Sequence, residues 1–121
     1  MKRTILALLL LLGLSEAFGA TCKISEYRAL AQDATGREIQ VALEPPITTQ
    51  TVTYTTSAQS SAFNAATRFI RVVCDAKAHF VISTAGTNAT SSSPYVAADS
   101  PEYFGVQAGA ALIIDFYDGS S

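Results

Sequence analysis

The chain has little of what catalytic and metal-binding sites need. Its 121 residues include one histidine, His79, no tryptophan and two cysteines, Cys22 and Cys74. A serine–histidine–carboxylate arrangement would have to use His79, and no serine is surrounded by the glycine pattern of a nucleophile elbow. One histidine and two widely separated cysteines do not match a zinc-binding spacing. We therefore expect a protein that is not an enzyme, with no catalytic residue, no metal site and no cofactor.

Positive charge is also scarce. After the first twenty residues, six basic and nine acidic residues remain, which gives a formal charge of −3. Arg68 and Arg71 are the only basic residues within one short segment, and in a strand they would point to opposite faces. Without a basic stripe, a nucleic-acid partner is not expected.

The carboxylates near the end of the chain do not form a recognisable pair. A calcium site or a glycosidase pair would have to come from Asp99, Glu102, Asp115 and Asp118. A glycosidase pair also needs a groove that holds a sugar. The strand pattern instead places these carboxylates at turns and solvent-exposed faces.

The first twenty residues differ in character from the rest and read as an export signal. Lys2 and Arg3 precede an uncharged apolar run over residues 5–14, and small or polar residues follow. A membrane-spanning helix needs about 20 apolar residues, roughly twice this length. The pattern predicts a signal peptide-like leader over residues 1–20, cut after Gly19 or Ala20, and a membrane contact that is only transient.

Two alternatives to cleavage stay open. The leader could be retained as a docking helix, or Cys22 could carry a lipid. The residues before Cys22 match a lipoprotein signal poorly, since Gly19-Ala20-Thr21 stands where a Leu-x-Gly or Leu-x-Ala sequence is usual. Residues 21–121 have a common single-domain length.

Short alternating segments separated by turn residues indicate an all-β fold. No apolar period of 3.6 residues persists over three turns after the leader, which argues against a helical fold. We predict a single antiparallel β-sandwich, jelly-roll-like, with seven or eight short strands. The clearest strands are expected at residues 22–25, 37–43, 50–56, 67–74, 78–83, 102–106 and 110–117.

Three local features of this pattern lead to specific expectations. Residues 67–74 form the strongest strand, and the short link 75–77 predicts a hairpin with 78–83. The strand at 37–43 places Ile39, Val41 and Leu43 on one face, toward the interior. Phe63 is the one large apolar residue of a polar loop, so we expect it to fill a place in the core.

Cys22 and Cys74 make an even number of cysteines in a chain that we expect to be exported. They permit a disulfide, which would close a loop of about 50 residues and stabilise the fold by roughly 4 kcal/mol. Two separate buried thiols are the alternative, because spacing alone does not show whether the Cα atoms approach closely enough.

The polar loop over residues 84–93 is a candidate interaction site. It is long, rich in small hydroxyl residues and expected to be exposed, as loops that contact partners are. Its candidate contact residues are Thr87, Asn88, Thr90, Ser91 and Ser92.

An ordered series of short motifs resembles a group of small tailed-phage and prophage proteins encoded among virion genes. The resemblance spans most of residues 23–106 and rests on the order of the motifs rather than on any one of them. The motifs are Lys23-Ile24-Ser25-Glu26-Tyr27, Gly36-Arg37, Glu44-Pro45, Gln50-Thr51-Val52-Thr53, Ser60-Ser61-Ala62-Phe63, Thr67-Arg68-Phe69-Ile70-Arg71-Val72 and Glu102-Tyr103-Phe104-Gly105-Val106, with Gly109 after them.

This resemblance implies a β-sandwich component of a phage particle, such as a head decoration or accessory protein. Its partners would be other virion proteins or copies of itself. It would form a homo-oligomer and would be located in the virion. The leader departs from the pattern, because phage head proteins assemble in the cytoplasm without an export signal. The alternative is therefore an exported protein, periplasmic or extracellular, that binds a glycan or a protein.

Overall fold

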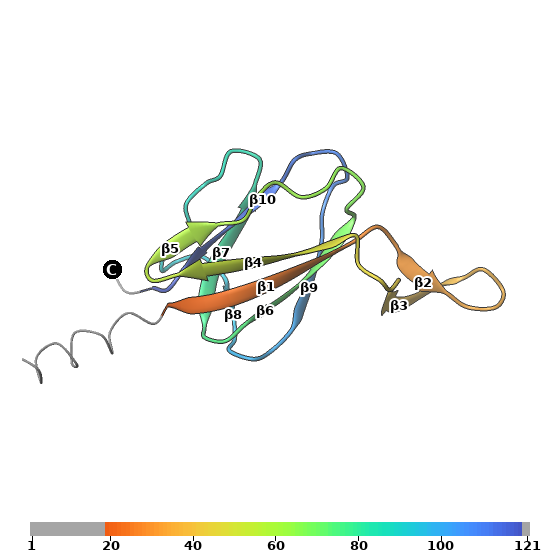
Figure 1. Ribbon diagram of the computed structural model, residues 1–121, viewed down its shortest axis with the longest axis horizontal. Coiled ribbons are helices and arrows are strands. Elements are labelled where there is room, and N and C mark those ends of the chain that lie inside the picture. The colour runs from red at the N-terminus through yellow and green to blue at the C-terminus, as the bar shows by residue number, and fades with distance from the viewer. Residues whose placement is uncertain (1–18, 120–121) are drawn as a thin grey trace, which may run out of the picture.

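The computed structural model describes residues 19–119, and there the chain is built from β-strands and turns (Figure 1). Eight strands form two four-stranded antiparallel sheets, and two shorter strands form a separate hairpin. The predicted all-β class is confirmed. Between residues 19 and 119 no helix is long and apolar enough to cross a membrane. The predicted leader lies outside the described residues except for Gly19 and Ala20.

The first sheet has the strand order β4–β1–β6–β9. Its strands are β1 (Ala20–Tyr27), β4 (Thr48–Tyr54), β6 (Phe69–Cys74) and β9 (Glu102–Gly105). Strand β6 lies between two neighbours, as its apolar density predicts, and every second side chain is buried. This alternation arises because successive residues of a strand point to opposite faces of the sheet.

The second sheet has the strand order β5–β10–β7–β8. Its strands are β5 (Ser57–Gln59), β7 (Ala78–Ser83), β8 (Tyr95–Val96) and β10 (Ile113–Tyr117). Apolar side chains of both sheets meet in one cluster, so the sheets pack face to face in a sandwich-like arrangement. Phe63 belongs to this cluster and is 6% exposed, which confirms its predicted place in the core.

The predicted hairpin between residues 67–74 and 78–83 is wrong. Strand β6 pairs with β1 and β9 in the first sheet, whereas β7 pairs with β10 and β8 in the second. The short link between them therefore crosses from one layer to the other. Both of its ends face the interior, because Cys74 and Ala78 are each fully buried.

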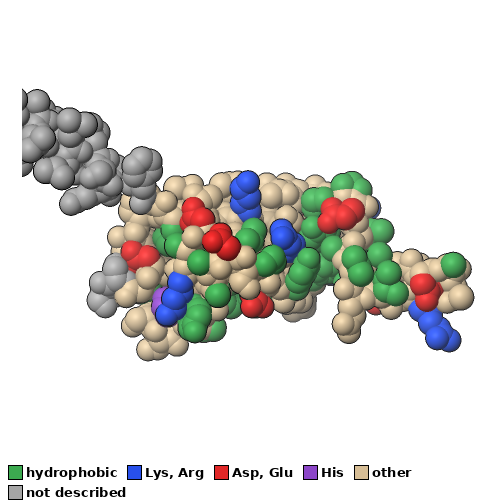
Figure 2. Space-filling view, turned by 90° about the horizontal axis from the view of Figure 1, so that it is seen from below, with side chains coloured by type: hydrophobic (Ala, Val, Ile, Leu, Met, Phe, Trp, Pro, Cys, Tyr) green, Lys and Arg blue, Asp and Glu red, His purple; other side chains and the backbone are tan. Residues whose placement is uncertain are grey.

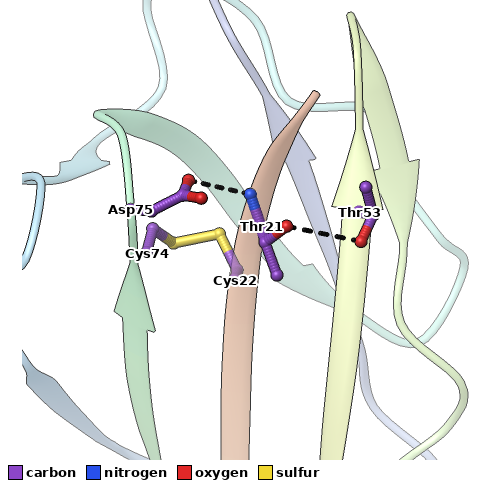
Figure 3. Close-up of a disulfide and its surroundings, with 5 residues drawn as sticks. All are labelled: Thr21, Cys22, Thr53, Cys74 and Asp75. Carbon is purple, nitrogen blue, oxygen red and sulfur yellow. Dashed lines mark hydrogen bonds between the residues drawn. A yellow bond between two sulfur atoms is a disulfide. The ribbon is translucent and has the colours of Figure 1, made fainter. Parts of the chain in front are cut away.

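A disulfide joins Cys22 on β1 to Cys74 on β6, and these two residues are directly paired in the sheet (Figure 3). Their Cα atoms are 4.0 Å apart. Next to the disulfide, the Asp75 carboxylate accepts a hydrogen bond from the Thr21 amide at 2.8 Å. The Thr21 hydroxyl also lies 3.4 Å from that of Thr53 on β4. The first strand is thus held on both sides at this end of the sandwich.

Candidate functional site: the arm and the groove beside it

The connection between β1 and β4 projects from the end of the sandwich as a two-stranded hairpin (Figure 1). Its strands are β2 (Leu30–Gln32) and β3 (Glu38–Ala42). We call residues 30–43 the arm. The sequence predicts the second strand but not that the strand leaves the body of the protein.

The tip of the arm is a turn built around Asp33. One oxygen of its carboxylate accepts hydrogen bonds from the Thr35 hydroxyl at 2.7 Å and from the amides of Thr35 and Arg37 at 2.9 and 3.0 Å. Gly36 has a φ of 84°, which glycine adopts without steric cost. The hydrogen bond from the Thr35 hydroxyl, followed by those from the backbone amides, lowers the pKa of Asp33, because these donors stabilise the ionised form.

We expect this turn to loosen in acid. The pKa of Asp33 is lower in the folded chain than in the unfolded chain. Its ionised carboxylate therefore stabilises the turn fully above the pKa that Asp33 has in the unfolded chain. This stabilisation is lost as the pH falls through the pKa of Asp33 in the folded chain. In an NMR titration, the Arg37 amide should shift with a midpoint below that of an ordinary aspartate. Thr35→Ala should raise this midpoint. An ordinary midpoint in the unaltered protein would contradict the geometry of the turn.

The arm exposes the apolar face that the sequence assigns to the interior. Ile39, Val41 and Leu43 are 40%, 58% and 42% exposed, so the prediction that this face is buried is wrong. The physical reason is that the hairpin extends past the end of both sheets, where no second layer covers it (Figure 1). Exposed apolar residues gathered on one face are typical of a protein interaction site.

The base of the arm is held firmly against the sandwich. The Tyr27 hydroxyl donates to the Glu44 carboxylate at 2.9 Å, and the Tyr27 ring stacks on Phe69 with their centroids 5.1 Å apart. The Leu43 amide donates to the carbonyl of Ala29 at 3.1 Å. Burial, and then the Glu44 carboxylate, raise the pKa of Tyr27. The arm therefore starts from a fixed position.

A groove of about 640 Å³ runs between the arm and the sandwich. Figure 2 shows this groove from below, with hydrophobic side chains on both of its sides. One wall is the arm, including Val41, and the opposite wall comes from the start of β6 and from β9. The wall formed by the sandwich contains Arg68, Phe69, Tyr103, Phe104 and Gly105. The volume of the groove is in the range of sites that hold a ligand.

Strand β9 forms an open edge of the first sheet beside this groove. Among the described residues it pairs only with β6. The Val106 amide donates a hydrogen bond to the Arg68 carbonyl. Along an antiparallel pair of strands, every second residue turns its amide and carbonyl away from the partner strand. On β9 these residues are Tyr103 and Gly105, whose amides and carbonyls point away from β6. A Cβ added at Gly105 would meet nothing within 4 Å. The edge is therefore open to another backbone.

Two guanidinium groups border the groove. Arg28 and Arg68 both line it and are exposed. Neither is in an ion pair with another described residue. Glu38 of the arm lines the same groove, so its charge is positive on balance. The groove thus combines aromatic walls, free backbone groups and a net positive charge, a combination that suits an extended segment of protein with acidic and apolar side chains.

Glu26 ties the base of the arm to the loop that follows β5. Its carboxylate is 1% exposed. It accepts hydrogen bonds from the Thr67 hydroxyl at 2.8 Å, the Asn64 amide at 2.7 Å and the Gln50 side chain at 3.0 Å. With three donors, this buried carboxylate is well satisfied, which points to a structural role.

No protein-family model, curated protein or solved structure matches the chain.

The loop predicted to contact partners is exposed but lies apart from the groove. Thr87, Asn88, Thr90, Ser91 and Ser92 are all exposed, and none of them lines the groove. Ala89, in their midst, is 6% exposed, and its amide donates to Asp115 at 2.7 Å. The loop is thus tied down at its centre.

Two residues considered for chemistry take structural places. His79 is 8% exposed, its Nδ1 lies 2.8 Å from the Ser93 carbonyl, and its ring contacts Tyr95 and Tyr117. Asp115 is 3% exposed, so its prediction as a solvent-facing carboxylate is wrong. It lies on the outer face of β10, where the loop around Ala89 covers it. No group of three or more metal-binding side chains occurs between residues 19 and 119.

Sequence reasoning missed the groove and its residues. Its walls come from segments far apart along the chain, and their approach depends on the pairing of β6 with β9. One local signal pointed to an unusual position for the arm. Pro45 and Pro46 follow it after one residue, and within sheets proline is confined to edge strands, strand ends and bulges.

Proposed function

We propose that the chain is a non-enzymatic structural protein, a component of a virus particle, that acts through protein–protein contacts. The observation that carries this proposal is the projecting arm with its exposed Ile39, Val41 and Leu43. A firmly held hairpin with an uncovered apolar face is costly to leave in water, and a partner protein removes this cost.

We also infer a jelly-roll-like connectivity, which favours the same role. A jelly roll of eight consecutive strands has strands 1, 8, 3 and 6 in one sheet and 2, 7, 4 and 5 in the other. Strands β4 to β10 take the first seven places in order, and β1 takes the place of the eighth. Jelly rolls occur in viral capsid and lectin domains. This support is an analogy of fold, since one fold hosts many functions.

The second candidate is an exported binding protein, and the disulfide favours it. Disulfides form and persist in oxidising compartments and are rare in the cytosol, where phage heads assemble. The bond between Cys22 and Cys74 fits a protein that leaves the cytoplasm, as the predicted leader also does. In this case the arm and groove would hold a protein partner at the cell surface or in the periplasm.

Particle purification tests the leading proposal. We expect the protein to copurify with intact particles from its native source at a fixed ratio to the major shell protein. Val41→Asp should abolish this copurification, because it places a charge on the apolar face of the arm. Tyr95→Asp is the matched control, since Tyr95 is equally exposed, at 56%, but lies outside the arm and the groove.

The two candidates predict different locations for the protein. Its absence from purified particles, together with a form cut after Gly19 or Ala20 in the exported fraction, would reject the particle role and support the exported one. N-terminal sequencing and quantitative mass spectrometry of both fractions measure this directly.

A further inference from the structure

We propose that the occupant of the groove is the arm of a second copy of this chain, with β3 of one copy added to the free edge of β9 in the next. The inference deepens the proposed function, because it names the partner of the same surface. It unites three features that are otherwise unexplained: an uncovered apolar hairpin, an open sheet edge and unpaired guanidinium groups beside that edge.

The backbones of the two strands suit one another. β3 has five residues and β9 has four, and within the described part of the chain each pairs on one side only. The Asp33 amide donates a hydrogen bond to the Arg37 carbonyl. In the neighbouring pair, Gln32 and Glu38, the amide and carbonyl of Glu38 therefore face the free edge of β3. On β9, those of Gly105 face outward, with open space around the glycine. Strand addition would satisfy both rows of groups.

The side chains of the two surfaces are also complementary. β3 alternates Glu38, Ile39, Gln40 and Val41, so one of its faces is polar and the other apolar. The apolar face has a counterpart in Phe69 and Phe104 of the groove, which are partly exposed.

Charge complementarity favours the same occupant. Glu38 lines the groove of its own copy together with Arg28 and Arg68, and none of these three side chains is in an ion pair within residues 19–119. Two guanidinium groups and one carboxylate give the groove a net positive charge, which a second Glu38, from an incoming arm, would balance. Charge-assisted hydrogen bonds between such groups are stronger than neutral ones.

This contact joins two different surfaces, an arm and a groove. Such a contact forms either a reciprocal pair, in which each arm enters the other groove, or a ring closed by rotation. Either arrangement requires both surfaces on every copy, and this requirement makes the contact testable with the protein alone.

Sedimentation velocity of the protein, purified as its source produces it, is the primary test. We expect a concentration-dependent oligomer. Ile39→Asp should weaken association by about 100-fold or more, because a charge would enter an apolar contact. Gly105→Pro removes an amide that points away from β6, and should weaken association by about tenfold. Gly105→Ala keeps this amide in open space and should associate as the unaltered protein does.

Mixing distinguishes this contact from symmetric ones. The Ile39→Asp chain keeps an intact groove, because Ile39 does not line it, and the Gly105→Pro chain keeps an intact arm. At a concentration at which neither variant associates alone, an equimolar mixture of the two should therefore form a complex of two copies. If Gly105→Pro leaves association unchanged, the contact is arm to arm. If Ile39→Asp leaves it unchanged, the contact is edge to edge. Either result overturns the proposal.

A charge exchange tests the assigned pairing. Arg68→Glu and Glu38→Arg should each weaken association, and the double variant should regain part of it. Failure of the double variant to do so would overturn the ionic part of the contact. A protein that is monomeric at all concentrations yet present in particles at a fixed ratio would overturn this inference and leave the proposed function standing. An oligomer that is absent from particles would do the reverse.

Discussion

Replacing both Cys22 and Cys74 by alanine should lower the free energy of unfolding by about 4 kcal/mol. The disulfide spans 52 positions, and a cross-link of this span removes much of the conformational entropy of the unfolded chain. It also joins paired residues of two central strands, so its loss frees the first strand at this end. Urea unfolding followed by circular dichroism measures the change.

The control for this prediction is chemical reduction of the unaltered protein. If the cross-link is the cause, reduced protein should unfold at nearly the same urea concentration as the double alanine variant. A double variant as stable as the oxidised protein would show that the unfolded chain is already confined near these cysteines. Thiol counting of the oxidised protein should find no free thiol, since both cysteines are in the disulfide.

Replacing Glu26 by alanine should lower the free energy of unfolding by about 3 kcal/mol. The change removes the acceptor of three hydrogen bonds, from the Thr67 hydroxyl, the Asn64 backbone amide and the Gln50 side chain. Each donor left without a partner in a buried place costs about 1–3 kcal/mol. Thr67 is 1% exposed, so water does not replace the lost acceptor there without a local opening.

Glu26→Gln is the matched variant, since it keeps the length of the side chain and one acceptor oxygen. We expect Glu26→Gln to lower the free energy of unfolding by about 1 kcal/mol. Hydrogen exchange of the Asn64 backbone amide should be faster than in the unaltered protein. If the alanine and glutamine variants are equally stable, the hydrogen bonds to Glu26 contribute nothing measurable. Both variants leave the groove residues unchanged, so their association should be unaffected while they are folded.

Local alternation predicted the strands because burial follows it. Ile70, Val72 and Cys74 alternate with more exposed neighbours on β6, and a sequence of this kind indicates a strand with one face on the core. The isolated Phe63 was also predictable, since a large apolar side chain in a polar loop has little reason to stay in water.

The partners of each strand could not be read from the same pattern. A short link such as Asp75-Ala76-Lys77 is compatible both with a hairpin and with a crossing between layers. In the structure the link crosses between the layers, because β6 pairs with β1 and β9, which are distant in the sequence. Long-range pairing of this kind depends on the packing of the whole chain.

The arm shows a second limit of sequence patterns. Ile39 and Val41 have the spacing of a core-facing strand, but alternation states only that two side chains share a face. It does not state what covers that face. The groove was beyond prediction for the same reason, because it exists only once the arm and β9 are placed side by side.

The positions of β1 and β10 have a consequence for synthesis. The first and the last strand of the described chain are both inner strands, each with a neighbour on either side. During synthesis β1 therefore gains its second neighbour only once β6 has been made. Strands β5 and β7 likewise lack the strand that joins them until β10 has been made, so neither sheet can form in the order of the chain.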